Sequence, residues 1–93
     1  MNGKENFKVL TAEVISVSEH PGAAHTIEIK TKGFIGYKND SLTIDPRCTF
    51  YKDDKQPKTI GIVKPGDTIK ATYIIHKGIK VAFNIIVMPV RAN

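Results

Sequence analysis

The chain has 93 residues, of which 41% are apolar and 25% charged, and its formal net charge is +5 at pH 7. This length allows one domain with one small core, and an ordinary apolar fraction argues against a disordered chain. No apolar run approaches the roughly 20 residues that a membrane-spanning helix needs, so we expect no membrane partner.

The shapes of the side chains predict the fold class. Ile, Val and Thr make up 28 of the 93 residues, against only two Leu and six Ala. β-Branched side chains fit a pleated surface, whereas helices prefer Leu and Ala. We therefore expect an all-β protein with little or no helix.

The N-terminal third predicts a leader and two strands. Residues 1–6 are polar and predict a flexible leader, ahead of a single domain over residues 7–93. Residues 7–19 predict a long strand whose apolar phase switches near Val14 and Ile15, which indicates a bulge. After a loop that contains Pro and Gly, residues 25–32 alternate between apolar and polar side chains and predict a second strand.

The middle of the chain is less regular. Two glycines make residues 33–40 either a continued strand or a flexible excursion. Residues 41–51 predict a third strand, which Pro46 weakens to an edge or a break. A charged loop at 52–58 and a short strand at 59–63 follow.

The C-terminal third predicts a hairpin. A type II turn at 64–67 leads to strands at 68–75 and 79–90, joined by a tight connection. About five strands in so short a chain predict a five-stranded OB-like β-barrel, with an SH3-like barrel or a small sandwich as competitors. The shared two-residue phase predicts a core of Ile27, Ile29, Ile69, Tyr73, Val81, Phe83 and Ile85.

Basic residues interleaved with aromatic residues are the main functional signal. Residues 1–29 carry a net charge of −2 and residues 30–93 a net charge of +7. Proteins bind single-stranded nucleic acid with cationic side chains along the phosphates and aromatic rings stacked on the bases. We expect Tyr37 and Tyr51 to be the stacking platforms. The candidate nucleic-acid-binding residues are Lys30, Lys32, Phe34, Tyr37, Lys38, Arg47, Tyr51, Lys52, Lys55 and Lys58.

Signals for catalysis and for cofactors are missing from the sequence. No glycine-rich phosphate loop occurs, and one cysteine with three scattered histidines does not make a zinc-binding pattern. We expect a non-enzymatic protein without a metal site or cofactor. The lone Cys48 and the polar N-terminus also favour a cytoplasmic protein.

Three segments carry a resemblance to a known family. They are Cys48-Thr49-Phe50-Tyr51, the stretch from Pro65 to Tyr73, and the stretch GIKVAFNIIVMPVRA at 78–92. Together they resemble the C-terminal half of the filamentous-phage single-stranded DNA-binding proteins, which are small OB-like barrels. The resemblance implies a viral, non-enzymatic homodimer that coats single-stranded DNA during replication. It assigns no binding residue, since the first half of the chain departs from the family.

Two further expectations concern partners. The last strand is apolar on both faces, so we expect Ile86 and Met88 to lie in a homodimer contact. Binding of single-stranded DNA is the expected function. The alternatives are an RNA-binding barrel and a protein–protein interaction module, such as an inhibitor or assembly subunit, that uses a sheet edge or an apolar patch.

Overall fold

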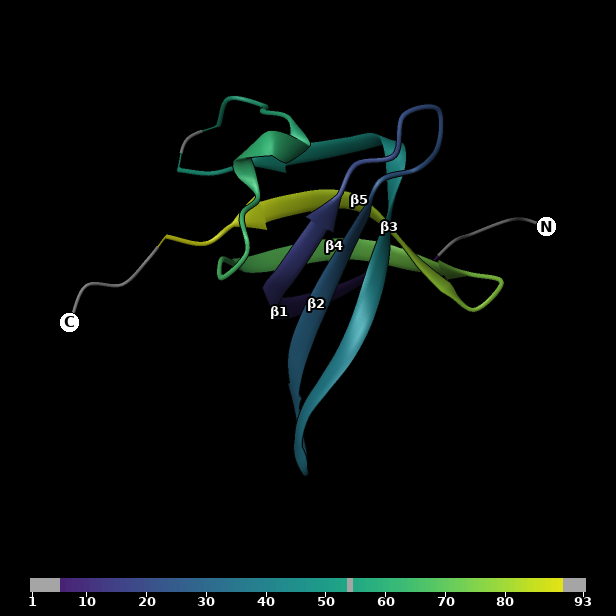
Figure 1. The fold of residues 1–93 in the computed structure, drawn as a ribbon, viewed down its shortest axis with the longest axis vertical. Helices are drawn as coiled ribbons and strands as arrows, with labels where there is room; N and C mark the ends of the chain where they lie inside the picture. Colours follow the sequence, from purple (N-terminus) through teal and green to yellow (C-terminus); the bar gives the residue numbers. More distant parts are fainter. Residues whose placement is uncertain (1–5, 54, 90–93) are drawn as a thin grey trace.

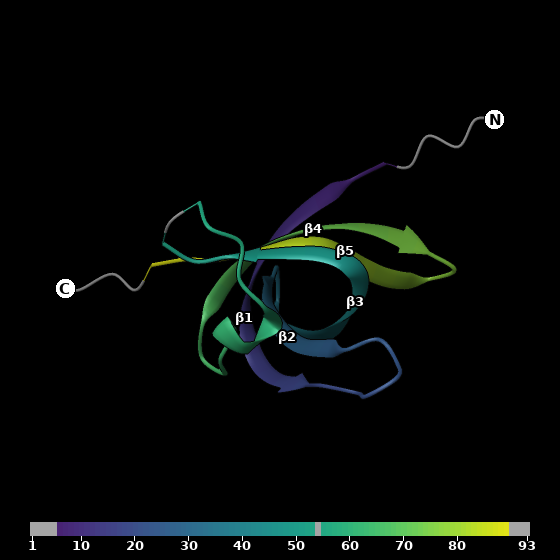
Figure 2. The ribbon, with the colours of Figure 1, turned by 90° about the horizontal axis from the view of Figure 1, so that it is seen from above.

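The computed structural model describes residues 6–53 and 55–89, and in this part of the chain five strands close into a barrel. The strands are β1 (Lys8–Ser18), β2 (Thr26–Gly33), β3 (Gly36–Tyr51), β4 (Thr68–His76) and β5 (Ile79–Val87). They follow one another in the order β1-β2-β3-β5-β4, and β4 pairs back onto β1 (Figure 1). Seen from above, the strands curve around a common interior (Figure 2). The predicted all-β, OB-like barrel is confirmed; the predicted leader lies, except for Asn6, outside the described residues.

The bulge that was predicted in the first strand is present. The pairing of β1 with β2 shifts register between Val14 and Ser16, so that Ile15 is the extra residue. A bulge bends a strand and increases its twist, which lets β1 pair with β2 at one end and with β4 at the other. Ile15 consequently points outward and is exposed, while Val14 is buried.

The core is built from the inward phase of all five strands. Ile27, Ile29, Ile69 and Ile85 are fully buried and Tyr73 is 8% exposed, as the alternation predicted. Leu42, Phe50 and Ile60 complete the buried cluster. Ile60 belongs to a short 3₁₀ helix, η1 (Ile60–Ile62), where the sequence predicted a strand. The buried side chains here are Ile60 and Val63, three positions apart as in one 3₁₀ turn, and the N–H of Val63 donates to the carbonyl of Ile60.

The core predictions for Val81 and Phe83 are wrong, because the structure contains a second bulge, which lies in β5. Thr72 of β4 pairs with Asn84, but the next residue, Tyr73, pairs with Ala82, so Phe83 has no opposite residue. The extra residue reverses the phase of β5 and turns Ala82 inward. Phe83 is only half-buried and packs edge-on against the ring of Phe7, with the ring centroids 5.6 Å apart.

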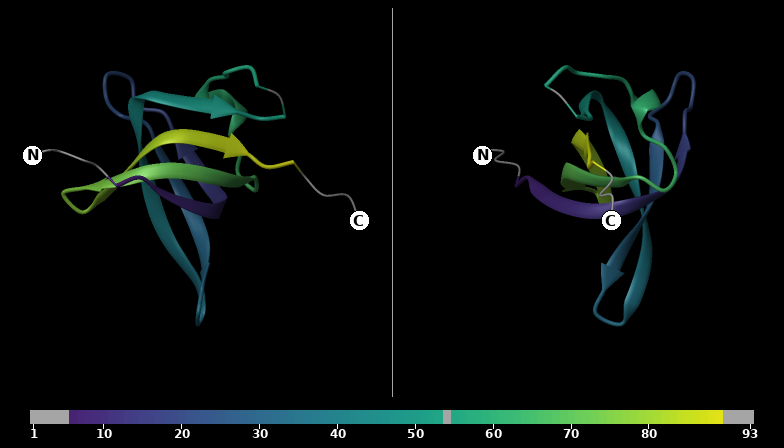
Figure 3. Two further views of the ribbon diagram at one scale, coloured as in Figure 1. Left: turned by 180° about the vertical axis from the view of Figure 1, so that it is seen from behind. Right: turned by 90° about the vertical axis from the view of Figure 1, so that its left-hand side faces the viewer.

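Residues 33–40, which the sequence left ambiguous, continue two strands into a projecting hairpin. β2 and β3 remain paired as far as Gly33 and Gly36, so Phe34 and Ile35 form a two-residue turn. The hairpin extends well beyond the barrel (Figures 1 and 3). The structure contains no helix, within its described residues, that is long and apolar enough to cross a membrane.

We predict unequal stability effects for two residues that are two positions apart on β5. Ile85→Ala should lower the free energy of unfolding by about 2–5 kcal/mol, since it leaves a cavity in the core. Phe83→Ala should lower it by only about 1–2 kcal/mol, which is less than a fully buried Phe loses, because its ring is only partly buried. Denaturant unfolding of both variants tests this, and an equal or larger effect at Phe83 would contradict the bulge.

Candidate functional site

A hollow in the molecule lies beside the second half of β3. We call it the β3 groove; its volume is about 730 Å³. Its floor is apolar, from Ile44, Phe50 and Ile60. Its walls are the loop that joins β1 to β2 on one side and Lys58 with Thr59 on the other. A concave, mostly apolar site of this size with a few polar groups on its rim is the usual form of a ligand-binding site.

An excursion of β3 out of the sheet forms one margin of this groove. β3 pairs with β2 only as far as Thr43. Its pairing with β5 stops at Ile44↔Ala82 and resumes at Thr49↔Asn84, so five steps along β3 match two along β5. Pro46 lies inside the excursion, where its missing N–H would have weakened a continuous ladder. The break that the sequence predicted at Pro46 is therefore confirmed, and it opens the groove.

An ion pair holds the excursion in shape. Asp45 Oδ1 accepts hydrogen bonds from the backbone N–H of Arg47 at 2.8 Å and from its Nε at 3.0 Å. These bonds hold the pKa of Asp45 below its ordinary value. The Arg47 guanidinium also lies 5.4 Å from the centre of the Phe83 ring, a cation–π contact. Arg47, a predicted nucleic-acid contact, thus fixes the local backbone.

The facing wall carries two histidines that are tied to each other. The backbone N–H of His20 donates to Nδ1 of His25 at 2.9 Å, and Nε2 of His20 lies 3.4 Å from Oγ1 of Thr26. The bond at Nδ1 places the proton of the neutral His25 ring on Nε2, which is then a donor. The carbonyl of His25 in turn accepts from the N–H of Ile44 at 2.9 Å, so the loop is attached to β3 at one end of the groove.

Three possible metal-ligand groups beside the groove are already engaged or protonated: the Cys48 thiol, the Asp45 carboxylate and Nδ1 of His25. Burial raises the pKa of the Cys48 thiol to about 12, with a smaller contribution from the charge of Asp45. Asp45 is bound to Arg47, and Nδ1 of His25 already accepts a hydrogen bond. Across the described residues, no three His, Cys, Asp or Glu side chains converge as they would around a metal ion.

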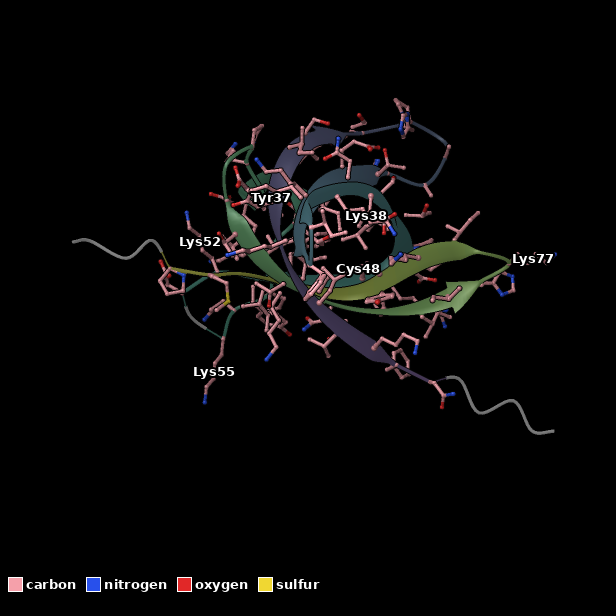
Figure 4. All side chains as sticks on the ribbon, turned by 90° about the horizontal axis from the view of Figure 1, so that it is seen from below. Tyr37, Lys38, Cys48, Lys52, Lys55 and Lys77 are labelled. Carbon is pink, nitrogen blue, oxygen red and sulfur yellow. The ribbon has the colours of Figure 1, made fainter. Side chains whose placement is uncertain are left out.

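The predicted nucleic-acid-binding residues fall into two groups that the structure separates. Lys30, Lys32, Phe34, Tyr37 and Lys38 lie on the projecting hairpin. Tyr51, Lys52, Lys55 and Lys58 lie at or after the far end of β3. Figures 1 and 3 show the hairpin and the loop over residues 52–58 at opposite ends of the molecule, and Figure 4 shows Lys52 and Lys55 to one side of the hairpin axis. One continuous groove does not collect both groups.

Individual residues in these groups differ in exposure. Phe34 and Tyr37 are exposed, Tyr51 is half-buried, and Lys58 donates its backbone N–H to the carbonyl of Phe50 at 2.7 Å. For the predicted homodimer contact, Ile86 is half-buried and Met88 is 37% exposed, on the outside of β5 and just beyond it. The homodimer stays a prediction.

The hairpin is anchored where it leaves the barrel. Asp40 of β3 accepts a charge-assisted hydrogen bond from Lys80 of β5, and Lys30 of β2 lies 3.7 Å from Glu13 of β1. The bond from Lys80 lowers the pKa of Asp40, and the same bond raises the pKa of Lys80. The two pairs join both strands of the hairpin to their barrel neighbours.

Comparison with known proteins identifies relatives in fold only. No family model and no curated protein matches the chain. It is similar to a solved structure of a copper(II)-bound tryptophan-to-alanine variant of CusF from Escherichia coli, at 14% identity and a TM-score of 0.56, over 94% of this chain and 98% of that chain. Apo-CusF from E. coli gives 16% identity and a TM-score of 0.47 over 92% and 94% of the two chains. Silver(I)-bound CusF gives 15% and 0.45 over 86% and 97%.

These findings overturn the expected relationship to phage single-stranded DNA-binding proteins. The solved structure that shows the fold of this chain is of a copper(II)-bound variant of CusF, and not of a DNA-binding protein. The predictions of DNA binding, of a role in replication and of a single-stranded DNA partner are therefore wrong as well. The physical reason is that short β-rich segments and a basic, aromatic composition are compatible with any small barrel of this kind. At 14% identity the likeness shows the barrel fold of this chain and nothing further.

The chemistry of Cys48 provides a test of the groove. With a pKa of about 12, the Cys48 thiol is ionised at pH 8 in roughly one protein molecule in ten thousand. A free thiol of pKa 8.5 is ionised in about a quarter of the molecules at the same pH. Alkylation of the folded protein by iodoacetamide should therefore be on the order of a thousandfold slower than alkylation in urea. Its rate should keep rising with pH beyond 9. A folded-state rate close to the unfolded one would show that Cys48 is not desolvated.

The anchor of the hairpin predicts a pH-dependent stability. The folded pKa of Asp40 is lowered, so its stabilisation is present above the unfolded pKa near 3.9 and is lost as pH falls through the folded value. Asp40→Asn should reduce the free energy of unfolding by up to about 1 kcal/mol at neutral pH, the size expected for a partly exposed pair. The difference from wild type should shrink below pH 4. Asp53→Asn, in the exposed loop, is the control, and an equal loss there would contradict the anchor.

Proposed function

We propose that this barrel is a non-enzymatic protein-interaction module that binds an extended peptide segment of a partner in the β3 groove. The observation that carries the proposal is the interrupted pairing of β3, which lies along a concave apolar surface. Exposed strand edges bind extended peptides by main-chain hydrogen bonds, while pockets beside the edge select alternate side chains.

The position of the excursion supports this use. Strand pairing on the β2 side ends at Thr43, and farther along β3 an isolated bridge joins Phe50 to Lys58. Between these points six residues of β3 lie beside the groove, and they loop out of the sheet, because Ile44 and Thr49 pair with β5 residues only two positions apart. A short peptide of a few extended residues fits beside this margin. The Asp45–Arg47 pair fixes the margin before any partner arrives, which reduces the entropy lost on binding.

The lining of the groove suggests the side chains of the peptide. The floor of the groove consists of Ile44, Phe50 and Ile60, which are nearly buried. In the loop wall, Ala23 and Ala24 have small side chains that leave room for a ligand. Residues of an extended peptide alternate between two faces, so every second side chain would meet this floor. The expected ligand is a segment with apolar residues at alternate positions.

Selection from a random peptide library tests the proposal. Peptides selected on the wild-type barrel should show alternating apolar residues, bind with micromolar affinity and shift the amide resonances around Cys48 and Phe50. Ala24→Trp should fill the groove and weaken those peptides by at least about tenfold, a loss of about 1.4 kcal/mol. Thr11→Trp, at an exposed position of β1 outside the groove, is the matched control.

Two results would contradict this function. Selection that yields no peptide dependent on the barrel would remove its basis. Peptides that bind Ala24→Trp as tightly as wild type would place the binding surface elsewhere, provided that the circular dichroism spectrum and thermal unfolding of the variant match those of the wild type.

A further inference from the structure

The turn of the projecting hairpin places its positive backbone angle at a flanking glycine. Gly33 and Gly36 are paired, so the two turn residues are Phe34 and Ile35. Hairpin turns that need positive φ angles at the turn residues favour Gly, Asn or Asp there. Here Gly36 has a φ of +119°, and neither Phe34 nor Ile35 has a positive φ. The turn residues therefore need no glycine, and two large apolar side chains lie at the apex instead.

Both apex side chains are fully exposed. Phe34 and Ile35 have relative exposures of 104% and 94%, and Tyr37 follows at 68%. Single exposed apolar residues are common, but adjacent residues with no packing at all at the end of a protruding element indicate a surface that another body covers. Neither contributes to the core, so stability does not explain them.

The charges behind the apex have one sign. Lys30, Lys32 and Lys38 lie between residues 30 and 39, and no acidic residue lies in that stretch. Lys30 is held 4.9 Å from the centre of the Tyr37 ring and also near Glu13. Lys32 and Lys38 are exposed and have no ion pair with any described residue. The charge of Lys38 also acts on Asp40, but the stretch from residue 30 to residue 39 is positive as a whole. This charge repels a second identical hairpin and attracts an anionic surface.

The spacing of these residues matches the layers of a bilayer surface. A strand rises about 3.3 Å per residue, so Lys32 lies about 7 Å behind the apex and Lys38 about 10 Å behind it. Interfacial segments bury their apolar residues about 5–10 Å into the boundary between headgroups and acyl chains. With Phe34 and Ile35 at that boundary, Tyr37 would lie among the headgroups, where aromatic residues are enriched, and the two lysines at the anionic phosphates.

We propose that the hairpin apex is a membrane-contact site that inserts Phe34 and Ile35 into the surface of an anionic phospholipid bilayer, with Lys32 and Lys38 binding the headgroups. The expectation of no membrane partner rested on the lack of a spanning segment, which does not bear on surface contact. The hairpin lies at the end of the ribbon opposite the loop after β1 and residues 58–60, two of the segments that line the β3 groove (Figure 3). This proposal therefore stands independently of the peptide-binding function.

A tryptophan reporter tests the insertion directly, since the chain contains no Trp of its own. Phe34→Trp should shift its fluorescence to the blue on mixing with phosphatidylcholine vesicles that contain about one third phosphatidylglycerol. Ile75→Trp, at an apolar position that is 51% exposed on the other long hairpin, is the matched control and should not shift. No shift at Phe34→Trp at low salt would overturn the proposal.

Vesicle co-sedimentation then separates the two parts of the contact. The double variant Phe34→Ser with Ile35→Ser should bind the anionic vesicles at least about tenfold more weakly, and the Ile75→Ser with Ile79→Ser control should bind like wild type. Replacing Lys32 and Lys38 with Gln should weaken binding about thirtyfold, at about 1 kcal/mol for each lysine. Equal binding to pure phosphatidylcholine, or unchanged binding after the apex substitutions, would overturn the site. The site would also be overturned if the wild-type protein self-associates in sedimentation and the apex substitutions abolish that self-association. In that case a second copy of the chain would cover the apex.

Discussion

The structure depends on one strand, β3, which takes part in the projecting hairpin, in the margin of the β3 groove and in the barrel wall. β3 is 16 residues long, and its first part pairs with β2 beyond the barrel wall, while its last part pairs with β5 inside the wall. Between the two parts it leaves the sheet around Pro46. At Thr43, before the excursion, β3 already pairs with both β2 and β5, so the length of the strand gives the hairpin. The excursion that follows gives the β3 groove.

Barrel closure from five short strands requires irregularities elsewhere as well. The bulge at Ile15 in β1 and the bulge at Phe83 in β5 each insert one residue and bend their strand. Bending is what brings β4 back to β1 and removes free edges along most of the barrel. The Phe83 bulge has a second effect. It turns Phe83 outward to meet both Phe7 and Arg47, so the packing of β5 also supports the excursion of β3 through the Asp45–Arg47 pair.

The sequence predicted those features that depend on local pattern. Strict alternation located Ile27 and Ile29 in the core, the phase switch located the bulge at Ile15, and Pro46 located the break in β3. It could not locate the bulge at Phe83, because the apolar residues on both faces of β5 hide the phase. The function was mispredicted for a similar reason. Composition gives the number of lysines and aromatic rings but not where they lie. The fold places the projecting hairpin, which carries Tyr37, and the residues that follow β3, which include Lys52, at opposite ends of the molecule. The groove had no sequence motif, since residues from three separate segments line it.

The distribution of polar anchors indicates that both surfaces are preformed. The groove margin is fixed by Asp45 and Arg47, its far wall by the bond from His20 to His25, and the base of the hairpin by Asp40 with Lys80. None of these bonds contributes to the buried core, which among the described residues is wholly apolar. The barrel therefore obtains its stability from Ile, Val and Phe, and its surface bonds set the shape of the parts that meet other molecules. A partner segment in the β3 groove would leave the hairpin apex uncovered, because the two lie at opposite ends. One molecule could then engage a partner and an anionic surface at the same time, with the rigid barrel setting the distance between them.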